Sequence, residues 1–227
     1  MRNCAPASPG NEGTLHRRLG IGDRLTTYVL RTLLAVTVVA LAGAVVAQAI
    51  GGRFAAATYV IAYLAWVLSE ARITVGKPTQ SAAENRTLVP YAAARVITAV
   101  TAAYSEPVVS LVVSIVPAGV FLAGVTLRSW AIHELGAQYS HRVVRISESG
   151  LICSGPYRVL RHPAYAGMLL ANIAFVSYFA SPASIGALTL LTAAILWRVR
   201  VEEGVLKMSP EYREFASTRG RFLPGVW

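Results

Sequence analysis

The chain has 227 residues, of which 55% are hydrophobic, and its mean hydropathy is +0.52, a composition that excludes an ordinary soluble domain. The formal net charge is +10 at pH 7. Basic residues concentrate between long apolar runs, so the charge follows membrane topology and does not indicate a nucleic-acid-binding surface. We therefore expect an integral membrane protein that binds no nucleic acid.

The N-terminal half predicts a tail followed by membrane helices. Residues 1–26 contain Pro, Gly, Ser, Asn and Arg, which predicts a disordered basic tail. Residues 27–127 are rich in Ala, Val and Leu and are expected to form a scaffold of transmembrane helices. Its apolar runs are 32–52, 54–69, 88–105 and 107–127. The run 88–105 includes Arg95 and is the weakest candidate.

The region 128–227 carries most of the chemically informative residues. Its residues 163–197 contain no Asp, Glu, Lys, Arg or His, and Ser181-Pro182-Ala183-Ser184 interrupts this run near its middle. This pattern predicts a helical hairpin that enters the membrane and returns. The expected fold is therefore an all-α bundle of six transmembrane helices, or five if 88–105 lies in the interface. An amphipathic helix over 202–218 is expected to follow.

With six spans, the basic segments share one face, which the positive-inside rule assigns to the cytoplasm. Both termini and both ends of the hairpin are then cytoplasmic. Arg outnumbers Lys strongly, and Ala and Val abound, which favours a bacterial inner membrane. His133, His141 and His162 lack metal-ligand spacing, so no metal is expected.

Polar residues at the two hairpin ends form the candidate site. Arg198 and Glu202 are four residues apart and share a helix face at the end of an apolar run, where charges are costly unless they are used. His162 precedes Pro163, which suits a first helical turn whose free N–H groups favour a carboxylate. Such a rim suits a zwitterionic or adenosine-containing ligand. The simpler interpretation, a helix-end ion pair beside a surface histidine, stays open here.

The ordered motifs of this region are Gly155-Pro156-Tyr157-Arg158-x-x-Arg161-His162-Pro163-x-Tyr165-x-Gly167, then Arg198-x-x-x-Glu202-Glu203-x-x-Leu206 and Glu211-Tyr212. Across about 128–227 they resemble the isoprenylcysteine carboxyl methyltransferase family, whose broader group includes phospholipid N-methyltransferases. The resemblance implies S-adenosyl-L-methionine in a cytosol-facing cofactor pocket. It also implies carboxyl O-methylation of a lipophilic or prenylated acceptor that enters from the bilayer.

Carried over position by position, the resemblance gives Arg198 as the residue facing the acceptor carboxylate and Glu202 as the partner of the methionine ammonium group, both in the catalytic set. The implied cofactor-binding residues are Ser149, Gly150, Leu151, Ile152, Tyr157, His162, Pro163, Ala164, Tyr165 and Glu202. Eukaryotic members usually have His where this chain has Ser149, which weakens that one assignment.

Three alternatives remain at this point. One is an N-methyltransferase acting on a phospholipid or another amine, although an ammonium acceptor needs a base and disfavours Arg198. The second is a membrane reductase with a similar C-terminal hairpin and a nicotinamide cofactor. The third is a membrane protein without enzymatic activity.

Overall fold

The computed structural model describes residues 12–74, 82–108, 114–136 and 152–223. Within these ranges the regular elements are helical, which confirms the predicted all-α fold. They are α1 (Glu12–Ile50), α2 (Phe54–Thr74), α3 (Ala82–Ala103), α4 (Ile115–Leu135), the 3₁₀ turn η2 (Gly155–Arg158), α5 (Pro163–Tyr178), α6 (Pro182–Leu206) and α7 (Pro210–Ser217).

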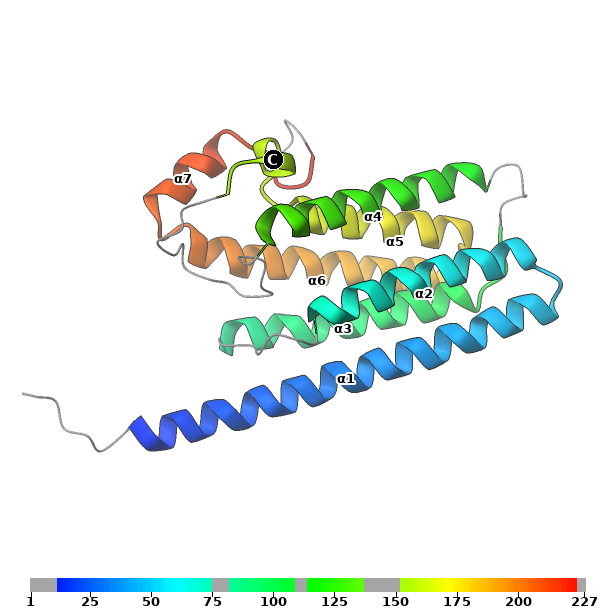
Figure 1. Ribbon diagram of the computed structural model, residues 1–227, viewed down its shortest axis with the longest axis horizontal. Coiled ribbons are helices and arrows are strands. Elements are labelled where there is room, and N and C mark those ends of the chain that lie inside the picture. The colour runs from blue at the N-terminus through cyan, green and yellow to red at the C-terminus, as the bar shows by residue number, and fades with distance from the viewer. Residues whose placement is uncertain (1–11, 75–81, 109–113, 137–151, 224–227) are drawn as a thin grey trace, which may run out of the picture.

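Helices α1 to α6 lie side by side as an elongated bundle, with α1 along one edge and α4 with α5 on the opposite side (Figure 1). Helix α3 contacts α1 on one side and α5 and α6 on the other, so it joins the N-terminal scaffold to the hairpin. The turn η2 and helix α7 gather at one end of the bundle (Figure 1). That end therefore holds segments from both halves of the chain.

Among the described residues, four helices are long and apolar enough to cross a membrane: Arg24–Ile50 of α1, Phe54–Ala71 of α2, all of α4 and all of α6. Helix α5 is apolar but shorter, with 16 residues. Helix α3 holds the uncertain run 88–105 as far as Ala103, and it packs inside the bundle. Each of the six expected membrane segments thus contains a helix among its described residues, and four of these helices meet the length and hydropathy requirements by themselves.

Two sequence-based boundaries were wrong. Helix α1 begins at Glu12, so residues 12–26 of the expected disordered tail are helical, while residues 1–11 lie outside the described part. The amphipathic helix expected over 202–218 is two helices, because α6 continues to Leu206 and α7 begins at Pro210. Proline at the first turn starts a helix readily and cannot continue one, so Pro210 separates the two.

The predicted helical hairpin consists of α5 and α6. Pro163 and Pro182 each occupy the first turn of their helix. Ser181 caps α6 through a capping box, in which its side chain accepts from the Ser184 N–H and the Ser184 side chain accepts from the Ser181 N–H. Ser105, after α3, donates to the Ser181 hydroxyl over 2.9 Å. These bonds fix the turn at the end of the bundle opposite α7.

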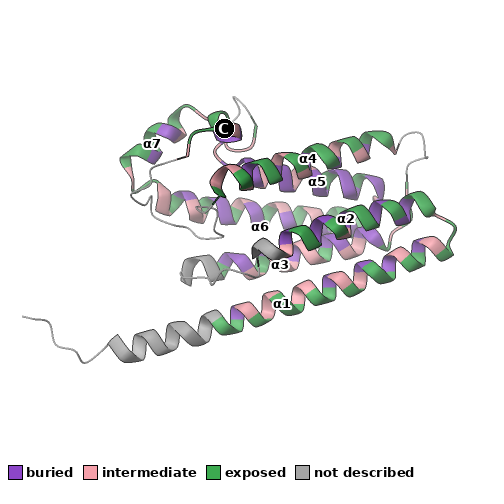
Figure 2. Cartoon of the chain, in the orientation of Figure 1, coloured by how far each residue is buried: buried purple, intermediate pink, exposed green. Residues whose placement is uncertain are grey.

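Helices α4 and α5 pack with their backbones in contact at two glycines. A Cβ atom placed on Gly124 would lie 2.6 Å from the Ala171 nitrogen, and one on Gly167 would lie 2.6 Å from the Gly124 carbonyl oxygen. No larger side chain fits at either position without moving a helix. Buried residues run along the inward faces of these helices, while the outer face of α4 is exposed (Figure 2).

Candidate functional site

The two ends of the hairpin are joined by a chain of hydrogen bonds. The Arg198 Nε–H on α6 donates to the Tyr165 hydroxyl on α5 over 2.8 Å, and that hydroxyl donates to Glu202 Oε2 over 3.2 Å. Arg198 Nη1 also donates to the Thr87 hydroxyl of α3 over 2.9 Å. The structure therefore brings together three predicted site residues and adds Thr87, which the sequence analysis did not select.

Local helix geometry explains this arrangement. Arg198 and Glu202 are one turn apart on α6, so their side chains project from the same face toward α5. Tyr165 lies in the first turn of α5. Arg198 is only 2% exposed, which places its charge inside the bundle instead of at the surface. The simple reading as a surface helix-end ion pair does not fit this burial, because a buried arginine has to be hydrogen-bonded.

Glu203, and not Glu202, is the most heavily contacted carboxylate at this end of the bundle. It is 1% exposed and contacts four basic side chains through hydrogen bonds or ion pairs. These partners are Arg161 Nη1 at 3.1 Å, His162 Nε2 at 3.1 Å, Lys207 Nζ at 3.2 Å, and Arg221 through Nε at 3.0 Å and Nη2 at 2.8 Å. Neighbouring helical residues point about 100° apart, which explains why Glu202 and Glu203 have different partners.

The segment after α7 is hydrogen-bonded to the residues just before α5. The Arg161 N–H donates to the Gly220 carbonyl over 2.8 Å, and the His162 N–H donates to the Arg221 carbonyl over 3.1 Å. The hydrogen bonds to Glu203 raise the pKa of Arg221. Residues 220 and 221 therefore hold residues 161 and 162 in place, through the two main-chain hydrogen bonds and through the Glu203 carboxylate that both Arg161 and Arg221 bind.

A small apolar cluster lies beside this charged group, built by α4, η2, α5 and α7. Its buried members are Ala131, Tyr157, Ala164, Tyr212 and Phe215, and Ile152 packs against them. Three predicted cofactor residues, Ile152, Tyr157 and Ala164, are thus gathered in one place. The Tyr212 hydroxyl is buried without a hydrogen-bond partner, and burial raises the pKa of this phenol, with Glu203 adding to the effect.

A second buried charge cluster ties the scaffold to the hairpin. Glu70 on α2 binds Arg128 on α4, through Arg128 Nε and Nη2, and also binds Arg95 Nη1 on α3 over 2.6 Å. Arg128 Nη1 in turn donates to the Ala164 carbonyl over 3.0 Å. The sequence analysis did not select Glu70. The sequence feature that could have identified Glu70 is its position near the end of an apolar run, because an acidic residue is unusual in a membrane segment.

Pro163 and Ala164 are both buried at the start of α5. The remaining predicted cofactor residues, Ser149, Gly150 and Leu151, lie outside the described residues. In the part of the chain that the structure describes, no group of three His, Cys, Asp or Glu side chains is arranged to hold a metal ion.

Comparisons with known proteins found one matching family and two similar proteins. Residues 116–208 match the isoprenylcysteine carboxyl methyltransferase (ICMT) family. A probable protein-S-isoprenylcysteine O-methyltransferase from Oryza sativa subsp. indica is 32% identical over 115 residues, which cover 46% of this chain and 58% of the relative, and its counterpart in Oryza sativa subsp. japonica gives the same values. The chain thus spans less than two thirds of the length of these relatives. The part of the chain that matches this family, residues 116–208, includes the α5–α6 hairpin and the Arg198–Tyr165–Glu202 chain.

Proposed function

We propose that this membrane protein transfers a methyl group from S-adenosyl-L-methionine to the carboxylate of a lipophilic acceptor. The observation that carries the proposal is the hydrogen-bonded chain of Arg198, Tyr165 and Glu202, which joins both ends of the hairpin to α3 through Thr87. The match of residues 116–208 to the isoprenylcysteine carboxyl methyltransferase family and the names of the rice relatives support this reaction class.

The side chains at the hairpin ends fit the cofactor's charges. Its methionine moiety carries an ammonium group and a carboxylate. Glu202 supplies an anion for the former, and Arg161 supplies a cation whose Nε–H is buried without an acceptor. An unused buried donor is uncommon in a folded protein and suits an anionic ligand group. The apolar cluster with Ile152 and Tyr157 suits the adenosine. His162, Pro163, Ala164 and Tyr165 would form the wall between these two parts.

The proposed reaction needs placement more than proton transfer. When bound, S-adenosyl-L-methionine supplies an electrophilic methyl group, and transfer to a carboxylate oxygen neutralises a positive and a negative charge without moving a proton. Arg198 is proposed to orient the acceptor carboxylate from its position between Thr87 and Tyr165. Holding reactants in line in this way lowers the barrier by up to several kcal/mol, on the order of the entropy saved.

We also propose that the reaction takes place at the cytoplasmic side of the membrane. The site lies at the end of the bundle that holds the basic residues Arg161, Lys207 and Arg221, which the positive-inside rule places in the cytoplasm. A lipophilic acceptor, such as an S-prenylated cysteine, would reach the site from the bilayer. Both chain termini are proposed to be cytoplasmic, in a bacterial inner membrane.

The test is methyl transfer by the purified protein in lipid nanodiscs, with tritiated S-adenosyl-L-methionine and an S-farnesylated cysteine derivative that has a free carboxylate. Arg198→Lys and Glu202→Gln are expected to lower transfer by about 100-fold or more, because each loses a charge-assisted contact at the reacting groups. Arg200→Lys, an exposed position on the same helix, serves as the matched control and should keep full activity.

The chemistry of the product separates the alternatives. A carboxyl ester releases tritiated methanol in alkali, whereas label that resists alkali would identify an amine acceptor. Transfer of tritium from NADPH, with none from S-adenosyl-L-methionine, would identify a reductase. Wild-type rates in both Arg198→Lys and Glu202→Gln would refute the residue roles.

A further inference from the structure

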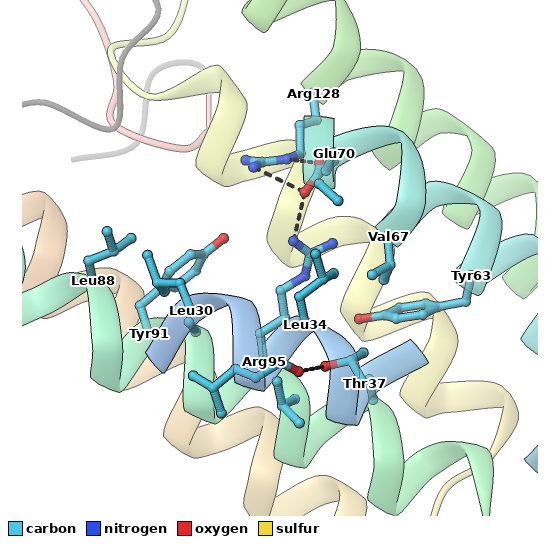
Figure 3. Close-up of a pocket in the computed structure, with 15 residues that line it drawn as sticks. Leu30, Leu34, Thr37, Tyr63, Val67, Glu70, Leu88, Tyr91, Arg95 and Arg128 are labelled. Carbon is cyan, nitrogen blue, oxygen red and sulfur yellow. Dashed lines mark hydrogen bonds and ion pairs between the residues drawn. The ribbon is translucent and has the colours of Figure 1, made fainter. Parts of the chain in front are cut away.

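A cavity of about 90 Å³ lies in the N-terminal scaffold, apart from the hairpin site, between α1, α2 and α3. Its walls are mostly apolar, with Leu30 and Leu34 from α1, Val67 from α2 and Leu88 from α3 (Figure 3). Its polar end is formed by Glu70, Arg95 and Arg128 (Figure 3). The cavity is therefore amphipathic, with charges at one end of an apolar space.

The polar end is a cluster of charged side chains, in which Arg95 and Arg128 both bind Glu70. Arg128 is 4% exposed and Glu70 is 7% exposed in their side chains. Charged groups among apolar helices are costly unless they are paired, so an anion that pairs with Arg95 lowers that cost.

Hydrogen-bond donors at this end also lack acceptors. Arg95 Nε and Nη2 are buried without a hydrogen-bond partner, although Nη1 binds Glu70. The Arg95 guanidinium lies over the Trp66 ring, 4.5 Å from its centroid, and the Trp66 indole N–H is likewise buried without an acceptor. Buried donors normally have a partner, so the two on Arg95, which lines the cavity, indicate a missing acceptor group.

We infer that this cavity binds a single-chain amphiphile with a carboxylate head group, such as a long-chain fatty or isoprenoid acid. The carboxylate takes the open donors of Arg95, while the first carbons of the apolar chain lie between α1 and α3 against Leu34 and Leu88. The cavity is too small for the whole ligand, so the rest of its single chain extends into the bilayer. This site goes beyond the proposed methyl transfer and lies mostly outside the residues that match the family.

The site is nevertheless connected to the hairpin. Leu88, in the cavity wall, follows Thr87, which binds Arg198. Arg128, at the polar end, binds the Ala164 carbonyl at the start of α5. A ligand in the cavity therefore contacts two residues whose neighbours or partners belong to the candidate active site.

Trp66 provides a direct readout. The measurement uses a Trp130→Phe, Trp197→Phe, Trp227→Phe protein in phosphatidylcholine nanodiscs, so that Trp66 is the remaining tryptophan. Dibromostearic acid is added, since bromine quenches indole fluorescence at short range. We expect saturable quenching that oleic acid reverses and methyl oleate does not, because the ester lacks the anionic charge.

Two variants separate binding from simple partition into lipid. Arg95→Gln is expected to weaken binding about tenfold or more, as a charge-assisted contact is lost. Because Arg95→Gln also perturbs Glu70, a second variant, Ala92→Leu, narrows the cavity and leaves the charges in place. Its matched control is Ala93→Leu, one residue along α3 and outside the cavity wall. We expect Ala92→Leu to weaken quenching at least tenfold and Ala93→Leu to leave it unchanged.

Three results would overturn the inference. They are quenching that never saturates, equal displacement by oleic acid and methyl oleate, and saturable quenching by brominated phosphatidylglycerol that oleic acid fails to reverse. None of these measurements involves methyl transfer, so the lipid site and the proposed function stand or fall separately.

Discussion

Arg221 and Glu203 form a bidentate ion pair, in which Arg221 donates from Nε to Oε1 over 3.0 Å and from Nη2 to Oε2 over 2.8 Å. The two residues are 18 positions apart, and this fork attaches the segment after α7 to the end of α6. Paired bonds between a guanidinium and a carboxylate are among the strongest polar contacts in proteins. Glu203 is therefore the shared anion that holds the basic side chains together at this end of the bundle.

Removing the charge of Glu203 should destabilise the protein. Glu203→Gln leaves Arg161, Arg221 and Lys207 close together without their shared anion, and breaking a buried pair in this way costs about 3–5 kcal/mol. The measurement is the free energy of unfolding in dodecylmaltoside micelles titrated with dodecyl sulfate. Glu214→Gln, an exposed position on α7, is the control and should change the value by less than about 0.5 kcal/mol. Equal values for the two variants would contradict the central role of Glu203.

Tyr165→Phe should impair activity with little effect on folding. The change removes the hydroxyl that accepts from Arg198 and donates to Glu202, while the ring stays in place. Losing a hydrogen bond to a charged group corresponds to about a 10–100-fold fall in kcat/KM for methyl transfer. Tyr178→Phe on the same helix serves as the control. A Tyr165→Phe protein with unchanged kinetics would show that the chain of three residues is not needed for the reaction.

The glycine contact between α4 and α5 should tolerate no methyl group. Gly124→Ala places a Cβ 2.6 Å from the Ala171 nitrogen, against rigid backbone, and overpacking of this kind costs about 1–3 kcal/mol. Gly119→Ala is the matched control on the same helix, because a Cβ there meets nothing within 4 Å. It should be neutral, or stabilising by up to about 1 kcal/mol through helix propensity. Unfolding in mixed micelles compares the two, and similar stability in both would contradict the close packing.

Tyr212→Phe should change how stability depends on pH. Burial raises the pKa of Tyr212 above its usual value of about 10, so above pH 10 the unfolded chain releases this proton more readily than the folded chain. Tyr212 thus contributes stability below pH 10 that is lost as the pH rises further. The Phe variant should lose less stability between pH 9 and pH 11 than the parent. At pH 7 it should be as stable or more stable by about 1 kcal/mol, because the buried hydroxyl has no partner.

Sequence pattern was sufficient for the hairpin. The run over 163–197 has no charged residues and is interrupted at Ser181-Pro182, and in a membrane such a run forms two helices joined by a turn. The two helices begin at Pro163 and Pro182. The approach of Tyr165 to Arg198 and Glu202 follows from the same pattern, since both ends of a hairpin lie together.

Contacts between segments that are distant in the sequence could not be predicted from sequence pattern. Glu70 is bound by Arg95 and Arg128, and Arg198 by Thr87, through packing of α2, α3 and α4 that no local pattern specifies. The start of α1 at Glu12 was missed for a different reason. Helix formation propagates from an established apolar segment into polar flanking residues that look disordered in composition.

The fork between Arg221 and Glu203 makes the candidate active site depend on the segment after α7. Without that segment Glu203 keeps Arg161, His162 and Lys207 beside it. A chain cut between Lys207 and Gly220 would therefore retain α6 but lose both the fork and the main-chain bonds that hold residues 161 and 162 at the candidate active site.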